Sequence, residues 1–338
     1  MKIYRKVLEL LETNEPVALL LVVAASGSTP QRAGAKAIAD RQGTLLAGTI
    51  GGGLMESKAL ATAVEVLRQD RPQLLEFQMD EPYDREAGPI CGGVMRIFAA
   101  PCRPQTCAPY RRALEAVEAR ERGLLLTTIA GPDAGRTRWL GASEIHDSAN
   151  PADKQFFSFL STQRSGTVLE PQTHTELFVA PVSPPPRMLI VGGGHVGQAV
   201  VQQAAWLGFE VTLLDDRPQF AQANRFAPGT RIVCGPIAAE VERFAKNADS
   251  YIVLVSKGHR PDAEALERCI HSEAAYIGMI GSARKVALLR KHFVESGFAS
   301  DEQFTRVHAP IGLDIGAVTV EEIATSIMAQ VVAVRRAG

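Results

Sequence analysis

The chain has 338 residues, of which 46% are hydrophobic and 22% charged, and its formal net charge is −1. These values are typical of a globular protein and exclude the strongly basic surface that binds nucleic acid or acidic lipid. No apolar stretch reaches transmembrane length, and the N-terminal residues lack the apolar core of a signal peptide. Five scattered cysteines argue against a disulfide framework, so we expect a cytoplasmic protein with reduced thiols.

The first 181 residues predict an α/β unit of irregular order. Hydrophobic patterning predicts its elements in this sequence: a helix near 3–12, a strand at 18–24, strands near 36–39 and 44–47, a helix over about 54–68, strands near 74–79 and 94–98, a helix rich in Arg and Glu after 107, an apolar run at 123–130 and a strand at 176–180. The polar stretch 131–152 is expected to be irregular.

Residues 182–186 contain three consecutive prolines and predict a stiff linker between two domains, 1–181 and 187–338. Strand patterns in the second domain alternate with helical patterns, which favours a doubly wound parallel sheet. The predicted strands lie at 188–191, 210–214, 231–233, 250–255 and 275–280. Thr319 and Glu322 form a capping-box pattern at the start of the last helix.

The most informative motif is GGGHVG at 192–197. It follows the predicted strand at 188–191 and begins a helix, and the next strand ends in Asp215, Asp216 and Arg217. This order of strand, glycine loop, helix, strand and acid is typical of a Rossmann dinucleotide-binding unit.

Each residue of the fingerprint has a physical role. Gly192 permits the tight turn, Gly194 lets the backbone approach a phosphate, and Gly197 lets the helix pack closely on the strand. The helix N-terminus attracts anions, and Asp215 is expected to accept hydrogen bonds from ribose hydroxyls. His195 either contacts a phosphate or a metal, or faces solvent at the start of the helix.

Two glycine-bearing loops in the N-terminal half are candidates for binding through the backbone. The loop 26–30 follows a strand, and strand carboxyl ends are where α/β sheets place ligands. The loop 48–53 ends in three glycines that form a nest for an anion at a helix start. Alternatively, both loops are only tight turns, and Glu56 only complements the helix dipole. The candidate binding residues are Ser26, Gly27, Ser28, Thr29, Gly51, Gly52, Gly53 and Glu56.

Cys91 is followed by two glycines, which leaves its thiol sterically open. Backbone N–H groups nearby would lower its pKa below the ordinary value of about 8.5 and make it a candidate reactive thiolate. The alternative is a small buried hydrophobic residue, the common fate of a free cysteine. Cys102 and Cys107 lack the paired spacing of zinc ligands, which disfavours a metal set with Cys91.

Further polar loops follow the predicted C-terminal strands and are expected at the carboxyl edge of the sheet. After the strand at 250–255, His259 and Asp262 form an acid–base pair, or Asp262 only caps a helix from 263. The segment 278–285 offers a glycine loop and cations for a phosphate, with candidate residues Gly281, Ser282, Arg284 and Lys285. The segment 310–316 is another loop of this rim.

Together these motifs resemble the xanthine dehydrogenase accessory factors, the XdhC/CoxI family. The N-terminal resemblance rests on SGSTPQRAGA (26–35), GTIGGGLMES (48–57) and ICGG (90–93). The C-terminal resemblance, to a Rossmann domain, rests on GGGHVGQA (192–199), LDDRPQFA (214–221), RF (225–226), SKGHRPD (256–262), YIGMIGSARK (276–285) and PIGLDIGAVTVEEIATSI (310–327). The chain departs from the family's usual Thr-His-Gly at 256–258 and Thr-Pro-Glu-Glu at 319–322.

The resemblance implies a protein that binds the molybdenum cofactor, as molybdopterin or its nucleotide form. It would protect the cofactor while a cysteine desulfurase supplies sulfur, and deliver it to a molybdenum hydroxylase such as xanthine dehydrogenase. The fingerprint 192–197 would hold phosphate or nucleotide, and Cys91 would contact molybdenum, which accepts soft sulfur donors. Such a carrier is a chaperone rather than a turnover enzyme. We expect a homodimer, the commonest oligomer.

Two other functions stay open. The fingerprint is also compatible with an NAD(P)-dependent oxidoreductase, in which Asp215 favours NAD, Arg217 tempers that preference, and His259 is the proton donor. A scaffold that has kept a Rossmann fold without ligand chemistry is the third hypothesis, and the glycine loops with neighbouring cations argue against it.

Overall fold

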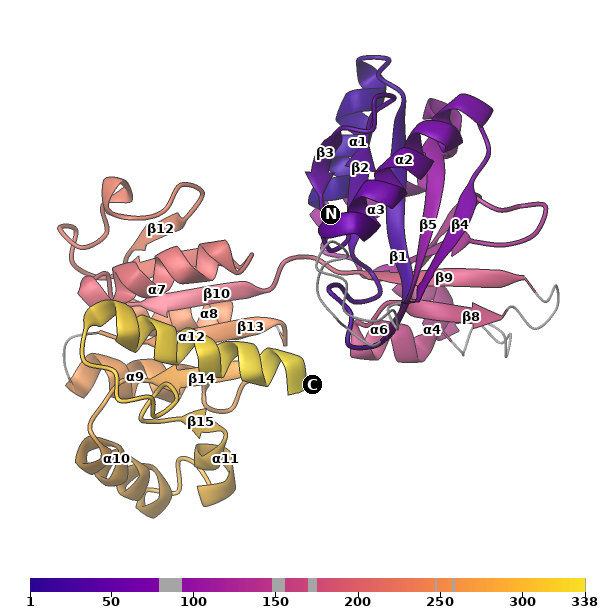
Figure 1. Cartoon of the computed structure of the whole chain (residues 1–338). Coiled ribbons are helices and arrows are strands. Elements are labelled where there is room, and N and C mark those ends of the chain that lie inside the picture. The colour runs from indigo at the N-terminus through magenta and orange to yellow at the C-terminus, as the bar shows by residue number, and fades with distance from the viewer. Residues whose placement is uncertain (79–92, 148–155, 170–174, 247, 257–258, 338) are drawn as a thin grey trace. The chain divides into compact units, whose positions relative to one another are not determined.

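The computed structural model describes residues 1–78, 93–147, 156–169, 175–246, 248–256 and 259–337, with the side chains of His259 and Arg260 outside the description. The chain divides into two compact units, Met1–Pro184 and Pro185–Gly338, each with its own sheets and core (Figure 1). The division falls within the run of prolines, and strand β9 of the first unit extends through Val182.

A five-stranded sheet with the order β3-β2-β1-β5-β4 forms the base of the first unit, and all its strand pairs are antiparallel. Its elements are the helices α1 (Lys2–Glu12) and α2 (Gly53–Gln69) and the strands β1 (Val17–Gly27), β2 (Lys36–Ala39), β3 (Leu45–Gly48), β4 (Gln73–Gln78) and β5 (Gly93–Cys102). The rule that ligands bind at the carboxyl ends of strands applies to parallel sheets. Because this sheet is antiparallel, the rule gives no reason to expect a ligand at the loop 26–30, and that part of the expectation is wrong. Ser26 and Gly27 belong to β1 and pair with Val94 and Gly93 of β5.

Strand β1 is the middle strand of this sheet, and both of its faces are covered. Leu19 and Leu21 pack into one core with α1 and α3 (Ala108–Glu118), whereas Leu20 and Val22 pack into another with α2. Successive side chains of a strand point to opposite faces, so a strand buried on both sides is continuously apolar.

A second antiparallel sheet completes this unit, with the order β7-β6-β9-β8. Its strands are β6 (Gly123–Thr128), β7 (Thr137–Gly141), β8 (Gly166–Leu169) and β9 (Glu176–Val182), and two short helices, α4 (Ala142–Asp147) and α6 (Phe157–Thr162), accompany it. The expectation that 131–152 is irregular is wrong where β7 and α4 form. Strand β7 lies at the sheet edge and is only half-buried, so its sequence lacks the apolar pattern of a buried strand. Its pairing with β6, in which Trp139 lies opposite Leu125, is therefore not predicted by the sequence.

The second unit is a six-stranded parallel sheet with the order β12-β11-β10-β13-β14-β15 and helices on both faces, which confirms the predicted Rossmann-type fold (Figure 1). The strands are β10 (Arg187–Val191), β11 (Glu210–Asp215), β12 (Arg231–Cys234), β13 (Ser250–Leu254), β14 (Tyr276–Met279) and β15 (Val307–His308). One face carries α7 (His195–Trp206) and α12 (Val320–Ala337). The other carries α8 (Ile237–Phe244), α9 (His259–Cys269), α10 (Ala283–Glu295) and α11 (Asp301–Thr305).

The last helix starts as its sequence predicts. The Thr319 N–H donates to Glu322 Oε2 at 2.8 Å, and the Glu322 N–H donates to Thr319 Oγ1 at 3.3 Å. These reciprocal hydrogen bonds are the capping box, which satisfies N–H groups that the helix itself leaves unpaired.

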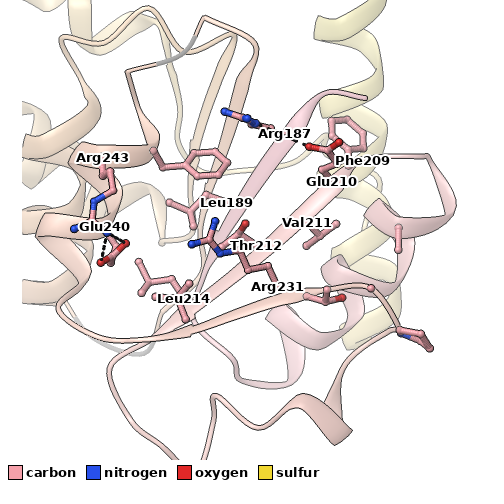
Figure 2. Close-up of a pocket in the computed structure, with 16 residues that line it drawn as sticks. Arg187, Leu189, Phe209, Glu210, Val211, Thr212, Leu214, Arg231, Glu240 and Arg243 are labelled. Carbon is pink, nitrogen blue, oxygen red and sulfur yellow. Dashed lines mark hydrogen bonds and ion pairs between the residues drawn. The ribbon is translucent and has the colours of Figure 1, made fainter. Parts of the chain in front are cut away.

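Helix α8 leaves part of its sheet face uncovered. A hollow of about 620 Å³ lies there, over β10, β11 and β12, and α8 forms one wall (Figure 2). It is separate from the glycine loop that follows β10. No helix among the described residues is long and apolar enough to cross a membrane.

Candidate functional site

The glycine loop between β10 and α7 has the geometry that its sequence predicts. Gly192 has a φ of +112°, and a Cβ there would lie 2.7 Å from the Val255 carbonyl oxygen. A Cβ on Gly197 would lie 1.8 Å from the Gly192 carbonyl oxygen, so only glycine permits the observed packing of α7 on the loop. A Cβ on Gly194 would meet nothing within 4 Å. Space therefore remains above Gly194, where a phosphate could approach the helix N-terminus.

Gly193, which the sequence analysis did not single out, is as constrained as Gly192. Its N–H donates to Asp215 Oδ2 at 2.7 Å, and a Cβ there would lie 2.2 Å from the Phe220 carbonyl oxygen. The only sequence signal for this constraint is that the middle residue of GGG is also a glycine. Gly193 ties the fingerprint to the segment that follows β11.

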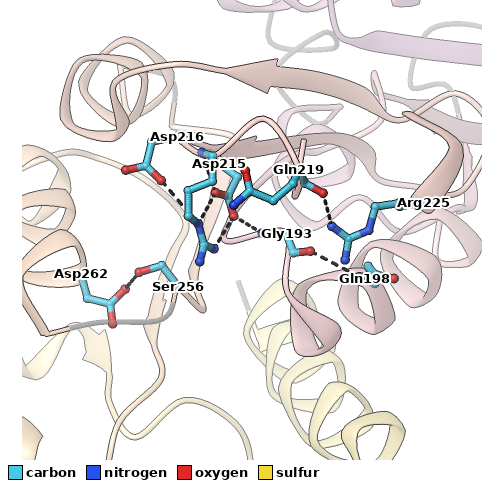
Figure 3. A network of polar contacts seen from close by, with 9 residues as sticks. Gly193, Gln198, Asp215, Asp216, Gln219, Arg225, Ser256 and Asp262 are labelled. Atoms are coloured by element: carbon cyan, nitrogen blue, oxygen red, sulfur yellow. Dashed lines mark hydrogen bonds and ion pairs between the residues drawn. The ribbon is translucent and has the colours of Figure 1, made fainter. Parts of the chain in front are cut away.

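Asp215 holds this site together from a buried position (Figure 3). Its Oδ1 accepts hydrogen bonds from the Arg217 N–H at 3.0 Å and from Arg217 Nε at 2.9 Å. Its Oδ2 accepts from the Gly193 N–H and from Arg217 Nη2 at 2.9 Å. Burial opposes ionisation of this carboxyl, but the hydrogen bonds from Arg217 and Gly193 outweigh it and lower its pKa. A carboxylate offers about four lone-pair sites, and all are engaged, so a ribose hydroxyl would have to displace a partner.

Two arginines flank one aromatic ring beside the fingerprint. The Arg217 guanidinium lies 4.0 Å and that of Arg225 5.0 Å from the Phe220 ring centroid. Arg225 is also fixed by donating from Nη1 to the Gln219 carbonyl at 2.7 Å (Figure 3). The motifs LDDRPQFA and RF contained these residues, but only the fold shows that they stack. Asp216, whose side chain is 54% exposed, remains the accessible acid here.

A second polar network lies after β13. The Ser256 hydroxyl donates to Asp262 Oδ1, and Lys285 Nζ donates to Asp262 Oδ2 at 2.8 Å. The Asp262 side chain is fully buried and that of Lys285 is 15% exposed. Asp215, Asp216, Arg217 and Ser256 share a small pocket of about 110 Å³ with two apolar residues. Because the Ser256 proton is donated to Asp262, its oxygen is left to accept a hydrogen bond in this pocket.

The structure revises two expectations for this network. Helix α9 begins at His259, so Asp262 lies in its first turn and the alternative that it caps a helix from 263 is wrong. Lys285 is paired with Asp262 rather than free to meet a phosphate. The His259 side chain lies outside the described residues, and its pairing with Asp262 stays a prediction.

Other predicted residues of this rim have simpler surroundings. Ser282 caps α10 by accepting a hydrogen bond from the Lys285 N–H at 3.2 Å. Gly281 is next to it, with the Lys285 side chain 3.1 Å from where its Cβ would be. Arg284 and His195 are exposed in the first turns of α10 and α7.

The N-terminal loops, which are far apart in sequence, come together in the first unit. A Cβ on Gly51 would lie 2.8 Å from Pro30 Cγ, so the loops 26–30 and 48–53 are in contact. A Cβ on Gly93 would lie 2.6 Å from the Ser26 carbonyl oxygen and 2.7 Å from that of Ser28. The end of the Cys-Gly-Gly motif therefore packs on the first loop. Cys91 itself lies outside the described residues.

The predicted anion nest already holds a carboxylate of this chain. Glu56 Oε2 accepts hydrogen bonds from Thr49 Oγ1 at 2.6 Å and from the Ile50 N–H at 3.0 Å. Burial opposes its ionisation, but these bonds and those from the glycine N–H groups lower the pKa of Glu56. Gly52 and Gly53 have φ of +73° and +62°, and a Cβ on either would meet nothing within 4 Å. The loop is thus built around an anion, with open space beside it.

Lys36 is a feature that the sequence analysis missed. Its Nζ donates to the Gly34 carbonyl at 2.7 Å and lies 5.5 Å from the Tyr4 ring centroid, and burial lowers its pKa to about 8. Its own carbonyl accepts from the Thr49 N–H at 3.1 Å, which places it against the loop 48–53. A lone lysine in a short strand gives no sequence signal of this environment.

The stability of the first unit is expected to rise between about pH 8 and 9.5. The folded state releases the Lys36 proton at lower pH than the unfolded state, whose lysine pKa is about 10.4, so the unfolded state holds more protons in this range. Urea unfolding followed by Trp139 fluorescence, in a Trp206→Phe background, measures it. Lys36→Met is expected to weaken the pH dependence, and an equal slope in both proteins would contradict this assignment.

The other two cysteines of the first unit belong to its hydrophobic core. Cys102 and Cys107 are both buried, and a hydrogen bond to Cys107 together with burial raises the pKa of Cys102 well above its ordinary value. Within the described part of the chain, no group of three or more His, Cys, Asp or Glu side chains is placed to hold a metal ion.

Comparison with known proteins matches both units to one family. Residues 10–78 match the XdhC and CoxI family, and residues 188–331 match the XdhC Rossmann domain. The chain belongs to the XdhC/CoxI family. The first match contains both N-terminal glycine loops, and the second contains the fingerprint, Asp215, Asp262 and Lys285. Cys91 lies between the two matched regions.

Relatives of this XdhC/CoxI protein extend over nearly all of the chain. It is 26% identical over 336 residues to the uncharacterized protein YqeB of Escherichia coli, and spans 46% of that relative's length. It is 22% identical over 329 residues to a protein of Bacillus subtilis described as a probable component of xanthine dehydrogenase, and spans 96% of it. A crystal structure described as a xanthine dehydrogenase from Bacillus halodurans has the same fold, with a TM-score of 0.79, 20% identity, and coverage of 99% of this chain and 96% of that one.

Proposed function

We propose that this protein takes part in the maturation of a molybdenum hydroxylase of the xanthine dehydrogenase type. In this proposal it binds the molybdenum cofactor, protects it during sulfuration and delivers it to the apo-enzyme. Family membership and the relatives named for xanthine dehydrogenase support the maturation role. The proposal extends to a cysteine desulfurase as the sulfur source and to a homodimer as the working form.

The observation that carries the binding step is the open backbone at Gly194. The cofactor is a pterin with a dithiolene and a phosphate, sometimes extended by a nucleotide. The fingerprint fits the phosphate, because the space above Gly194 is free and the N-terminus of α7 favours an anion. Arg217 and Arg225 lie beside it, and Ser256 offers an acceptor for a donor group of the ligand.

The N-terminal unit fits an anion in a second way. Its converged loops surround the Glu56 carboxylate, which a more strongly bound ligand anion would replace at Thr49 and Ile50. Cys91 belongs to the motif whose last glycine packs on Ser26 and Ser28. We propose Cys91 as the thiolate that contacts molybdenum or handles sulfur.

Anaerobic binding of molybdenum cofactor, followed by molybdenum analysis of the desalted protein, tests the proposal. Wild type is expected to retain molybdenum, and Cys91→Ala to lose it. Cys234→Ala, which removes an exposed cysteine of the second unit, is the matched control and is expected to retain it. Failure of wild type to bind would remove the carrier proposal, whereas retention by Cys91→Ala would remove only the role of Cys91.

An NAD(P)-dependent oxidoreductase is the weaker proposal. Its main sequence support was Asp215 as an acceptor for ribose hydroxyls. That carboxylate already accepts four hydrogen bonds, so it has no free lone pair for a ribose hydroxyl. Calorimetric titration with NADH and NADPH distinguishes the two, because the oxidoreductase requires saturable binding of one of them.

A further inference from the structure

The hollow on the α8 face of the parallel sheet is a site that the cofactor proposal does not use. It has a volume of about 620 Å³, within the range of small-molecule sites in proteins. Residues from β10, β11 and β12 line it together with residues of α8, and its lining continues to Ala205, Phe209 and the segment 228–230. Figure 2 labels Glu240 and Arg243, which lie on the α8 side. Ser256 and the fingerprint glycines do not line it.

Strand register arranges the floor in rows. Arg187 is paired with Glu210 in the first row, next to the amino ends of the strands. Thr212 is the partner of Leu189 on one side and of Arg231 on the other. Alternate residues of a strand share a face, and neighbouring parallel strands lie about 4.8 Å apart. The lining is therefore polar near Arg187 and becomes apolar further along the strands, towards Val233.

Among the apolar residues that line the hollow on the α8 side, Val233 and Phe244 are half-buried, whereas Leu189 and Leu214 beneath them are fully buried. Leu214 and Val233 are register partners, so their side chains are adjacent on this face. Phe244 of α8 lines the same hollow. The apolar part of an occupant would therefore contact Val233 and the Phe244 ring.

Charge at the polar end is not balanced. Arg187 lies 3.9 Å from Glu210, and Arg243 Nη1 lies 3.0 Å from both carboxylate oxygens of Glu240. Arg231 makes no side-chain hydrogen bond or ion pair with any described residue, and the same holds for the Thr212 hydroxyl. Three arginines and two glutamates leave one positive charge, on a guanidinium whose planar donors match a carboxylate.

We propose that this hollow binds an amphipathic small molecule with one negative charge, of the class of monocarboxylates with an apolar tail. The carboxylate is held by Arg231 and by the Thr212 hydroxyl, and the tail lies on Val233 and Phe244. The site is distinct from the carboxyl-edge site and does not depend on cofactor binding.

Isothermal titration of the full chain with decanoate tests this site. Saturable binding of one molecule is expected, and decyltrimethylammonium, with the same tail and the opposite charge, is expected not to bind. Arg231→Gln is expected to raise the dissociation constant about tenfold or more, because it removes a charged hydrogen-bond partner. Arg336→Gln, the same change at an exposed arginine of α12, is expected to leave it unchanged.

Several results would overturn the site. These are the absence of decanoate binding, equal binding by wild type and Arg231→Gln, or equal binding of the cationic analogue. Self-association of the protein that Arg231→Gln abolishes, without decanoate binding, would instead make this face an interface between copies of the chain. Thermal unfolding of each variant confirms that it is folded.

Discussion

Replacing Asp262 with alanine is expected to lower the free energy of unfolding of the second unit by about 3 kcal/mol. The Asp262 carboxylate is fully buried and accepts hydrogen bonds from Lys285 and Ser256. Its removal takes away the carboxylate that Lys285 Nζ, on a side chain only 15% exposed, contacts at 2.8 Å. Hydrogen exchange of peptides from β13 and β14 measures the change within the full chain, because core strands open with the free energy of the whole unit.

Two comparisons make this result specific. The double variant Asp262→Ala, Lys285→Met is expected to recover part of the loss, since it also removes the largely buried ammonium. Asp301→Ala breaks the ion pair with Arg290 on the surface of the same unit and is expected to change stability little, because both partners are well exposed. If Asp262→Ala were as stable as wild type, the network would not be part of what holds the carboxyl edge together.

The fold was largely predictable because its signals are local. Strand β1 is apolar over seven consecutive buried residues, 17–23, and strand β10 is similarly covered on both faces, so neither depends on a distant partner for its pattern. Strand β7 was missed for the opposite reason. It gains its stability from pairing with β6, and its own half-buried side chains show no clear alternation.

The sequence predicted the glycines of the site but not the hydrogen-bond partners of its two carboxylates, Asp215 and Glu56. A glycine such as Gly192 or Gly197 reports a backbone constraint that recurs wherever the motif folds. The saturation of Asp215 depends on where Gly193 and Arg217 place their donors, which spacing alone does not fix. The capture of Glu56 by Thr49 likewise arises from the fold of the loop, and it changes a free nest into one that a ligand must compete for.

Two glycine-to-alanine substitutions in the fingerprint are expected to separate folding from binding. Gly197→Ala places a Cβ 1.8 Å from the Gly192 carbonyl oxygen, so α7 must move away from the loop. We expect a loss of about 3 kcal/mol or more in the stability of the second unit. Gly194→Ala meets nothing within 4 Å, and φ at this position is −70°, which alanine adopts readily. Its cost is expected to be at most about 1 kcal/mol, for a poorer helix cap.

Binding is expected to show the reverse order of effects. In Gly194→Ala the new methyl group occupies the space through which a phosphate approaches the backbone, so affinity for the molybdenum cofactor is expected to fall about tenfold or more in a folded protein. Hydrogen exchange in β10 and anaerobic cofactor binding, measured on the same samples, provide both readouts. If Gly194→Ala bound the cofactor as tightly as wild type, the phosphate would not lie at this loop. The N-terminal nest around Glu56 would then be the remaining anion site, and its test would be Glu56→Gln, which removes the competing charge and should tighten binding there.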